Sequence, residues 1–459
     1  MKKLLLLIAV SLGAAMGGRS VGLSAEQALT VSIFTFSILG TLFFWDFRLT
    51  LVFVGSGALF LMRGIDLENF IKYASLDVII FIIGMMIIVG MVKESGVFHW
   101  LARAIVGLKW LGAAGLFLAL MLISAVFSAL MGEATSIMVM MVIILEICDY
   151  LKVHPAPLVI SSVLSTNVGS AATVLGNPVG ILIALRGGFS FEEFLVRAFP
   201  LAVAILAVTM ALICIWYRAY IRSLSVAVRA RRQEGGLSGP AVKLGKDAKA
   251  SIVIFAATLL SIAAHSRIEL IFGLEENELL VVIPIIFAGI ALAYKHSKIK
   301  QYIEEEVEWT SILFLMFLFA LTGALQTSGT TNVLAERLIK SAGSHPAFLS
   351  GLTIFSSSIL SSILDNTVVV ASYIPMLQGL QSLGLNLKPL WWCLLFGACL
   401  GGNITAIGST ANIVALGVLE KEKGIKIDFI EWLKIGLIVG LVTSIIAYIA
   451  IISLPIFST

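Results

Sequence analysis

The chain has 459 residues, of which 59% are hydrophobic and 13% carry a charge, and its formal net charge is +4. A soluble domain is about 25% charged, so a soluble enzyme of this length is excluded. Apolar residues occur in runs of about 17–25, the length that a helix needs to cross a bilayer. The composition predicts an all-α polytopic membrane protein, and we expect it to be a multi-pass protein of the cytoplasmic (inner) cell membrane, with no nucleic-acid partner.

Residues 1–26 are the first predicted unit. Lys2 and Lys3 precede an apolar segment that extends from Leu4 to Gly18. A basic start followed by a short apolar core is typical of a secretory signal, but a short first transmembrane helix has the same pattern. The sequence leaves both alternatives open.

Residues 27–220 are predicted to form a first repeat. Its apolar crossings fall at about 27–45, 48–62, 76–93 and 198–217. The segment 110–149 is long but interrupted by polar residues near its middle, which is typical of a re-entrant helical hairpin. The segment 156–185 also contains a polar break, and we interpret it as a discontinuous helix.

Residues 221–250 are predicted to be a basic linker. Lys and Arg outnumber Asp and Glu strongly in this stretch, so the positive-inside rule places it in the cytoplasm. Counting crossings outward from this linker puts most of the 31 basic residues inside. The N-terminus is then inside, and the C-terminus is outside if Leu4–Gly18 spans the membrane.

Residues 251–459 are predicted to form a second repeat, with a hairpin at 346–380 and a broken helix at 388–418. The motif that begins at Gly90 recurs at Gly323, and at the same offset Glu133 falls on Asn366. Each half contains five crossings and one hairpin. Because five is odd, the second repeat must lie inverted in the membrane. Inverted repeats with broken helices at the midplane are typical of secondary transporters.

Four polar breaks are expected to converge on one binding site: two hairpin tips and two interrupted helices. Backbone that unwinds inside a membrane must be satisfied by protein groups or by a water-filled site. Asn, Ser and Thr supply oxygens there, and the N-termini of half-helices can face an anion. The predicted substrate- or ion-binding residues are Glu133, Thr135, Asn167, Asn177, Asp365, Asn366, Thr367, Asn403, Thr405, Ser409 and Asn412.

The two carboxylates among them, Glu133 and Asp365, are the strongest signals. A carboxylate at the bilayer centre costs about 2.5–3.5 kcal/mol, so it usually faces a cavity and serves function. We expect both to take part in proton coupling, with an internal helix-capping or helix-pairing acid as the alternative. For neutral residues such as Asn403, Thr405 and Ser409, interhelical hydrogen bonding is an equally good interpretation.

These breaks resemble the ion transporter superfamily, in its ArsB/NhaD/P-protein branch of arsenite pumps, sodium/proton antiporters and the melanosomal P protein. The sequence around Asp365-Asn366-Thr367, with Pro375 following, is similar to the second hairpin tip of that branch. The stretch from Gly401 to Asn412 is similar to its second broken helix. The first tip departs from the pattern, because Glu133 stands where that branch carries Asp-Asn or Ser-Asn-Thr.

The resemblance implies a transport domain of hairpins and broken helices that moves against a scaffold built from the first and second crossings of each repeat. It implies that the protein can form a homodimer. If the protein is an arsenite pump, the resemblance also implies an ATPase subunit as a partner. No Walker motif, Ser/His/Asp set or HExxH is present, so we expect no enzyme activity, no cofactor and no bound metal.

Three functions remain open from the sequence. The leading hypothesis is a proton-coupled antiporter that extrudes arsenite or antimonite, or sodium, with H⁺ and/or Na⁺ as the coupling ion. A sodium-driven importer of an anion or carboxylate is the alternative. A channel is disfavoured, because paired closed tips form a binding site rather than an open pore.

Overall fold

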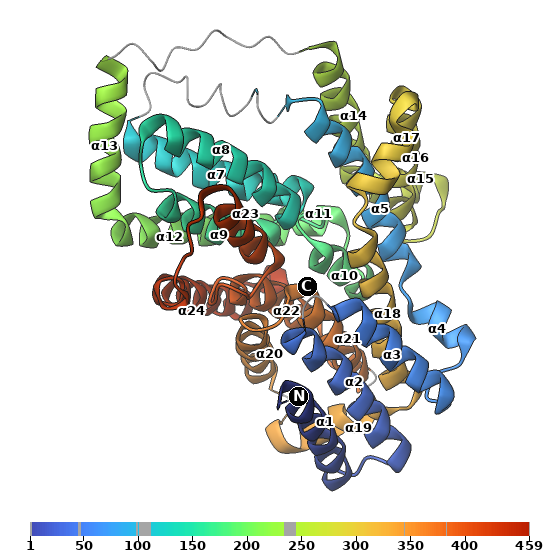
Figure 1. Cartoon of the computed structure of the whole chain (residues 1–459). Coiled ribbons are helices and arrows are strands. Elements are labelled where there is room, and N and C mark those ends of the chain that lie inside the picture. Colours follow the sequence, from blue (N-terminus) through green and yellow to red (C-terminus); the bar gives the residue numbers. More distant parts are fainter. Residues whose placement is uncertain are drawn as a thin grey trace.

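The structure is a computed structural model of the whole chain, and it describes residues 2–44, 47–97, 100, 112–233, 245–343, 345–381 and 383–458 (Figure 1). Within these residues every regular element is a helix and no strand occurs. Seven helices in the described ranges are long and apolar enough to cross a membrane, or up to nine if each sharply bent helix pair counts as one crossing. The predicted all-helical membrane fold is thus confirmed. Residues 110–111 of the first hairpin and 234–244 of the linker lie outside the described residues.

Among the described residues, five helices precede the first hairpin. They are α1 (Lys2–Ser20), α2 (Ala25–Phe43), α3 (Arg48–Leu61), α4 (Leu67–Tyr73) and α5 (Leu76–Glu94). The segment whose role the sequence leaves open is a continuous helix, α1, which packs against α2. Helix α2 begins where the Ser24 side chain accepts a hydrogen bond from the backbone N–H of Gln27, while the Gln27 side chain accepts one from the backbone N–H of Ser24. This reciprocal capping box fixes the start of the helix.

The first predicted hairpin consists of α7 (Ala113–Met131) and α8 (Glu133–Leu151). Gly132 joins them with φ +88°, a backbone conformation that L side chains rarely adopt. The first predicted broken helix follows as α9 (Ala156–Ser170) and α10 (Pro178–Gly187), with residues 171–177 unwound between them. The polar and glycine-rich interruptions in the sequence therefore mark the actual breaks.

The first half ends in α11 (Phe191–Glu193), the π-helical turn η2 (Phe194–Ala198) and the crossing helix α12 (Phe199–Trp216). The predicted linker begins as a regular helix, α13 (Arg218–Gln233), before the chain reaches residues that the structure does not describe. The basic residues of this segment are thus presented on a helix over its first part.

The second half repeats this order of elements. Its first part contains α14 (Lys246–Ala263), α15 (His265–Phe272), α16 (Glu278–Tyr294), η3 (His296–Lys298), α17 (Ile299–Gln301), η4 (Tyr302–Glu306), α18 (Trp309–Thr327) and α19 (Thr330–Ala342). The hairpin α20 (Pro346–Ser361) and α21 (Asn366–Gln381), the broken helix α22 (Lys388–Gly401) and α23 (Thr410–Lys423), the helix α24 (Phe429–Ser453) and the turn η5 (Pro455–Phe457) complete it. The inverted relation of the two halves stays a prediction.

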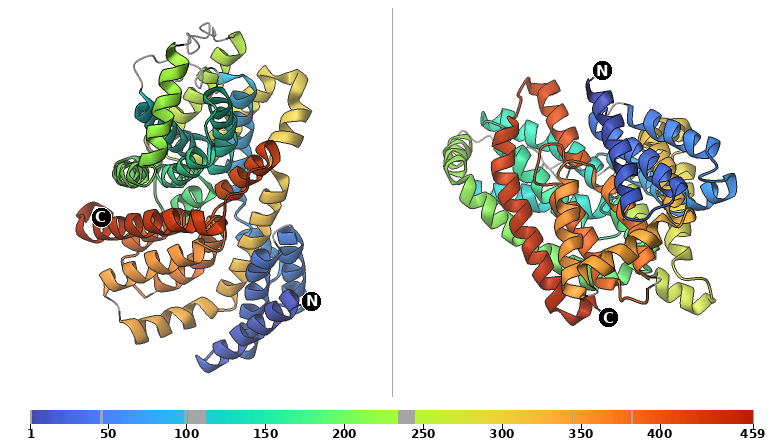
Figure 2. Two further views of the ribbon diagram at one scale, coloured as in Figure 1. Left: turned by 60° about the vertical axis from the view of Figure 1, so that its left-hand side comes forward. Right: turned by 90° about the horizontal axis from the view of Figure 1, so that it is seen from below.

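The crossing helices pack into two groups. Helices α2, α3, α5, α14, α16 and α18 contact one another and form the first group, which we call the scaffold. The hairpins and broken helices pack together with α12 and α24 in the second group, which we call the transport domain. In Figures 1 and 2 the α7–α8 hairpin and α13 lie toward one end of the molecule, and α19 and α20 lie toward the other.

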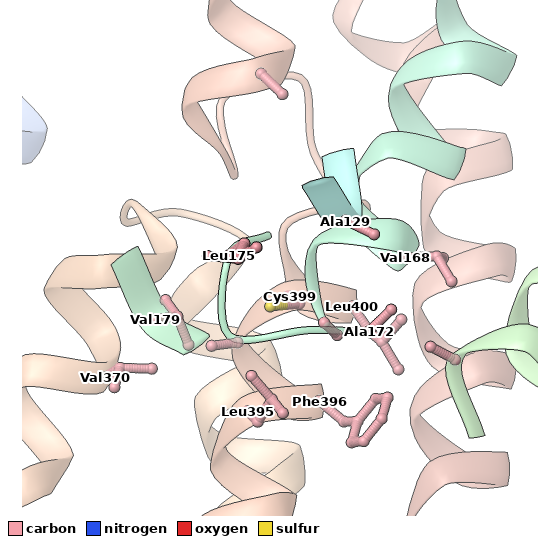
Figure 3. Packing of buried hydrophobic residues seen from close by; sticks show 14 of the residues in the cluster. Ala129, Val168, Ala172, Leu175, Val179, Val370, Leu395, Phe396, Cys399 and Leu400 are labelled. Atoms are coloured by element: carbon pink, nitrogen blue, oxygen red, sulfur yellow. The ribbon is translucent and has the colours of Figure 1, made fainter. Parts of the chain in front are cut away.

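Glycine allows each broken helix to lie directly against its hairpin. A Cβ on Gly169 of α9 would lie 2.2 Å from the carbonyl oxygen of Ala125 in α7. A Cβ on Gly401 of α22 would lie 2.4 Å from the carbonyl oxygen of Ser358 in α20. Real Cβ atoms do not approach oxygen so closely, so only glycine permits these contacts. Figure 3 shows the apolar side chains, among them Leu395 and Cys399 of α22, that pack around the first unwound segment.

Candidate functional site

Each broken helix restarts with a side-chain cap. The Asn177 Oδ1 accepts a hydrogen bond of 3.0 Å from the backbone N–H of Gly180, and Pro178 occupies the first turn of α10. In the second half the Ser409 Oγ accepts from the backbone N–H of Asn412 at 3.4 Å. Proline and an Asn or Ser cap favour a helix start. The unwound segments therefore end at defined residues, and they place two helix N-termini inside the transport domain.

Threonine ties each unwound segment to the neighbouring hairpin. The Thr173 Oγ1 donates to the carbonyl oxygen of Ala129, at the end of α7. The Thr405 Oγ1 donates to the carbonyl oxygen of Ser362, directly after α20. The same contact thus occurs in both halves, between elements that the sequence repeat pairs.

A cavity of about 150 Å³ lies between the transport domain and the scaffold. Among the predicted site residues, those that line it are Glu133, Thr135, Asn177, Asp365 and Thr367. They come from both hairpin tips and from the first broken helix. The structure therefore brings these five predicted residues together at one cavity, and their role in binding stays a prediction.

The Asp365 carboxylate is held by two donors at the wall of this cavity. Its Oδ1 accepts a hydrogen bond of 2.9 Å from the backbone N–H of Thr367. Its Oδ2 accepts one of 2.6 Å from the Thr410 Oγ1, at the start of α23. Asp365 is only half-buried, so its oxygens also reach the cavity.

The Glu133 carboxylate is more deeply placed, with 6% of the residue exposed. Its Oε2 lies 3.4 Å from the side-chain amide of Asn366, at the other hairpin tip. It also lies 3.5 Å from the Asn177 Nδ2. Both contacts are long, and the groups that face the Glu133 carboxylate are the amides of Asn177 and Asn366 and the hydroxyl of Ser170.

The six remaining predicted residues do not line the cavity. Asn366 lies behind Glu133, and Asn167, Asn403, Ser409 and Asn412 join the two broken helices. Thr405 binds the second hairpin at Ser362. The Asn167 Nδ2 donates to the Asn403 Oδ1 at 2.9 Å and to the Asn412 Oδ1 at 3.0 Å. The Asn412 Nδ2 donates to two carbonyl oxygens of the second break, both at 2.8 Å. These side chains use their polar atoms on one another, and a role for them in ion binding stays a prediction.

Four polar residues that line the cavity were not among the site residues predicted from the sequence. Thr410 begins α23, and Arg48, Glu308 and Ser311 reach the cavity from the scaffold. The Arg48 Nη2 donates to the Ser311 Oγ at 3.4 Å. All three scaffold residues lie at or next to the beginning of an apolar helix, where a polar residue gives no signal of a binding site. Only their position beside the hairpin tips shows that they contribute to the site.

A second cavity, of about 480 Å³, lies along the same boundary at the other end of α5. It contains an ion pair between the scaffold and the transport domain. Arg186 of α10 donates to both carboxylate oxygens of Asp77 in α5, at 2.9 and 3.0 Å, and to the Ser75 Oγ at 2.8 Å. The first cavity lies beside the beginning of α18, and this one beside its end.

Among the described residues, no three His, Cys, Asp or Glu side chains gather in a way that could hold a metal ion. All four cysteines are free thiols. Cys399 alone approaches the site, with its Sγ 3.3 Å from the Asn177 Nδ2. The oxygens of the carboxylates, amides and hydroxyls therefore dominate the chemistry of the cavity.

Comparison with known proteins shows the family of the chain. The family model described as "Citrate transporter" matches residues 34–397 and 279–457. An uncharacterized transporter of Mycobacterium tuberculosis is 31% identical over 382 residues, which cover 80% of this chain and 83% of the relative. An uncharacterized transporter of Synechocystis is 27% identical over 422 residues, which cover 86% of this chain and 89% of the relative.

The human P protein is 26% identical over 450 residues, which cover 81% of this chain and 52% of that protein. The resemblance carried by the second tip and the second broken helix is thereby confirmed. The chain is a multi-pass membrane transporter, and its substrate and coupling ion are not decided by these relatives.

Proposed function

The chain belongs to the citrate transporter family, and we propose that it is a secondary transporter in which Glu133 and Asp365 bind the coupling cation. The observation that carries this proposal is that both carboxylates, one from each hairpin, line a single cavity between the transport domain and the scaffold. Two acids that line one cavity attract a cation or a proton, since either of them offsets the mutual repulsion of the carboxylates.

We favour proton-coupled antiport of sodium. The cavity adds the hydroxyls of Thr135, Thr367 and Thr410 to the two carboxylates. Oxygen donors of this kind suit a hard cation such as Na⁺. A proton and a sodium ion would then compete for the same carboxylates, and this competition is the simplest basis for exchange. Arsenite or antimonite as the exported substrate has less support, because no cysteine lines the cavity and Cys399 only contacts Asn177 of its wall.

Alternating access would expose the two cavities in turn. Both lie between the scaffold and the transport domain, the first beside the middle and second half of α5 and the second beside its beginning. Glu94, at the end of α5, pairs with Lys298, and the neighbouring Lys295 pairs with Asp247 of the predicted cytoplasmic linker. The first cavity would therefore open to the cytoplasm in the cytoplasmic membrane, while the Asp77–Arg186 pair closes the outer side.

A second candidate function is cation-driven import of a carboxylate. The matching family model is described as a citrate transporter. Arg48 lies on the scaffold wall of the first cavity, opposite the acids. A guanidinium group binds a carboxylate with two parallel hydrogen bonds, so Arg48 could receive an anion while Glu133 and Asp365 hold the driving cations.

The test uses the full chain reconstituted in proteoliposomes. A sodium gradient should drive proton movement in the opposite direction in the wild type, and Asp365→Asn should abolish it. Asp428→Asn is the matched control, because Asp428 is exposed and lies outside the site. Sodium-dependent uptake of labelled citrate without proton exchange would replace antiport by import. Exchange that survives in Asp365→Asn would overturn the proposal for this residue.

A resistance panel in a pump-deficient host separates the exported substrates. Growth in sodium, lithium, arsenite and antimonite is compared for the wild type, Asp365→Asn and the Asp428→Asn control. Protection against sodium and lithium alone supports sodium antiport. Protection against arsenite or antimonite alone would instead assign metalloid export.

A further inference from the structure

Helix α13 is strongly basic and lies at the margin of the molecule. Its 16 residues include five arginines and no acidic residue. It follows the crossing helix α12, which ends at Trp216, and it packs against α7 and α8 of the first hairpin. In Figure 1 it stands across the ends of these two helices. One side of α13 therefore faces the hairpin, and the other is turned away from the protein.

The inner face joins α13 to the base of the first hairpin. Leu224 and Val228 are buried, with 0% and 4% of each residue exposed. The Tyr220 hydroxyl donates a hydrogen bond of 2.8 Å to a backbone carbonyl oxygen in the loop after α8. The Arg231 Nε donates to the carbonyl oxygen of Tyr150 at 3.0 Å, and its guanidinium group lies 5.2 Å from the centre of the Tyr150 ring. These contacts recur every three or four residues, so they occupy one face of the helix.

The outer face presents three arginines to the surroundings. Arg218, Arg222 and Arg229 are exposed, and their spacings of four and seven residues place them on one side of the helix. Between described residues, no ion pair involves any of the three. Val226 lies among them and is 71% exposed. Cations that surround an exposed apolar side chain fit a surface that is anionic at its boundary and apolar beneath it.

We propose that the outer face of α13 binds the headgroups of anionic phospholipids in the cytoplasmic leaflet, and thereby holds the base of the first hairpin at the membrane surface. The positive-inside rule places this helix on the cytoplasmic side. That leaflet is rich in anionic lipids, which attract basic segments next to a membrane crossing. A guanidinium group also binds phosphate oxygens with two parallel hydrogen bonds.

The neighbouring residues favour a lipid over a soluble anion. Ile215 and Trp216, at the end of α12, are 68% and 43% exposed. Tryptophan at the end of a crossing is typical of the boundary between membrane and water. Arg218 begins α13 two residues later, so the helix begins at the level of the lipid headgroups. A soluble phosphate compound would use the arginines but would leave Val226 without a partner.

A lipid bound to α13 would act on the hairpin that carries Glu133. The rings of Tyr220 and Phe117 lie 6.5 Å apart, near the start of α7, and Arg231 contacts Tyr150 near the end of α8. Helix α13 is thus attached to both arms of the hairpin, at the end opposite its tip. Anchoring it to the membrane would restrain the base of the hairpin. This inference goes beyond the proposed function, since it depends on neither the cation nor the substrate.

The experiment is photo-cross-linking of the purified full chain in nanodiscs that contain equal amounts of phosphatidylcholine and phosphatidylglycerol. A trace of one or the other lipid carries a photoreactive group beside its headgroup, and mass spectrometry identifies the labelled peptides. The phosphatidylglycerol probe should label α13 more strongly than the phosphatidylcholine probe. One arginine near an anionic surface contributes about fivefold to binding. Replacing Arg218, Arg222 and Arg229 together by glutamine should therefore lower the labelling by at least about tenfold.

Two further variants make the result specific. Replacing the same three arginines by lysine keeps the charge and should retain most of the labelling. The matched control replaces the exposed Lys246, Lys249 and Lys300 by glutamine, which removes the same charge outside α13, and it should label like the wild type. Equal labelling of α13 by the two probes, or full labelling in the glutamine variant of α13, would overturn the proposal. Labelling that soluble tripolyphosphate abolishes at constant ionic strength would overturn it in favour of a soluble anion.

Hydrogen–deuterium exchange tests the effect on the hairpin. Backbone amides near Phe117 and Tyr150 are compared in nanodiscs with and without phosphatidylglycerol. The anionic lipid should slow their exchange in the wild type but not in the glutamine variant of α13. Equal exchange rates in the two kinds of nanodisc would contradict the anchoring of the hairpin. Neither measurement uses transport, so failure of the proposed cation exchange and failure of lipid binding are distinguished.

Discussion

The side-chain amide of Asn366 lies 3.4 Å from the Oε2 of Glu133, so the tips of the two hairpins contact each other inside the transport domain. The two residues also hold corresponding positions in the two halves of the sequence. The charge of Glu133 at the first tip therefore acts directly on Asn366 at the second tip, with no other element between them.

The hydroxyl of Thr410 should determine how well Asp365 holds a cation. Thr410→Val removes the 2.6 Å hydrogen bond to the Asp365 Oδ2 with little change of shape. A hydrogen bond to a charged group contributes about 1.5–3 kcal/mol, so the KM for sodium should change by roughly tenfold or more. Thr258→Val, in the scaffold helix α14, is the matched control. An unchanged sodium KM in proteoliposomes would show that Thr410 does not support the site.

The ion pair of Asp77 and Arg186 should hold the second cavity closed. Both side chains are partly exposed, at 36% and 26%, so the pair contributes at most about 1 kcal/mol. Asp77→Asn should therefore raise the labelling rate of a Gln378→Cys reporter in the second cavity by up to about fivefold. The reagent is a membrane-impermeant thiol probe applied from outside. Asp247→Asn, which breaks an ion pair within the scaffold, should leave the rate unchanged.

The close contact of Gly401 with Ser358 should be sensitive to a single methyl group. Gly401→Ala places a Cβ 2.4 Å from a backbone oxygen, and overpacking of this kind destabilises by about 1–3 kcal/mol. The thermal unfolding midpoint in detergent should fall. Gly417→Ala is the control, because nothing lies within 4 Å of its Cβ in α23. Equal midpoints for the two variants would contradict the packing argument.

Arg48 should separate the two candidate functions. Arg48→Gln removes a positive charge from the wall of the first cavity. If the chain exchanges sodium for protons, the KM for sodium should fall by a few-fold, since a like charge is removed near the cation. If it imports a carboxylate, citrate uptake should be lost and Arg48→Lys should restore it only in part. Sodium exchange and citrate uptake that both stay at wild-type values would exclude Arg48 from the site.

The sequence by itself determined the class of protein and the position of its breaks. Lipid cannot satisfy unpaired backbone groups, so polar and glycine-rich interruptions inside apolar runs had to mark hairpin tips and broken helices. Gly132 and the stretch that begins at Gly401 fall at such breaks in the structure. The pairing of Glu133 with Asp365 as the acids of one site also follows from the sequence, since both stand at tips.

Only the tertiary structure decided which polar side chains face the cavity. Asn177 and Asn167 both lie in the first broken helix, and the sequence does not distinguish them. In the structure Asn177 lines the cavity, whereas the side-chain amide of Asn167 donates to Asn403 and Asn412. Arg48 joins the site from another part of the chain. The physical reason is that hydrogen-bond partners and cavity walls come from helices far apart in sequence. Local pattern tells where a helix must break, and packing determines what the freed polar groups contact.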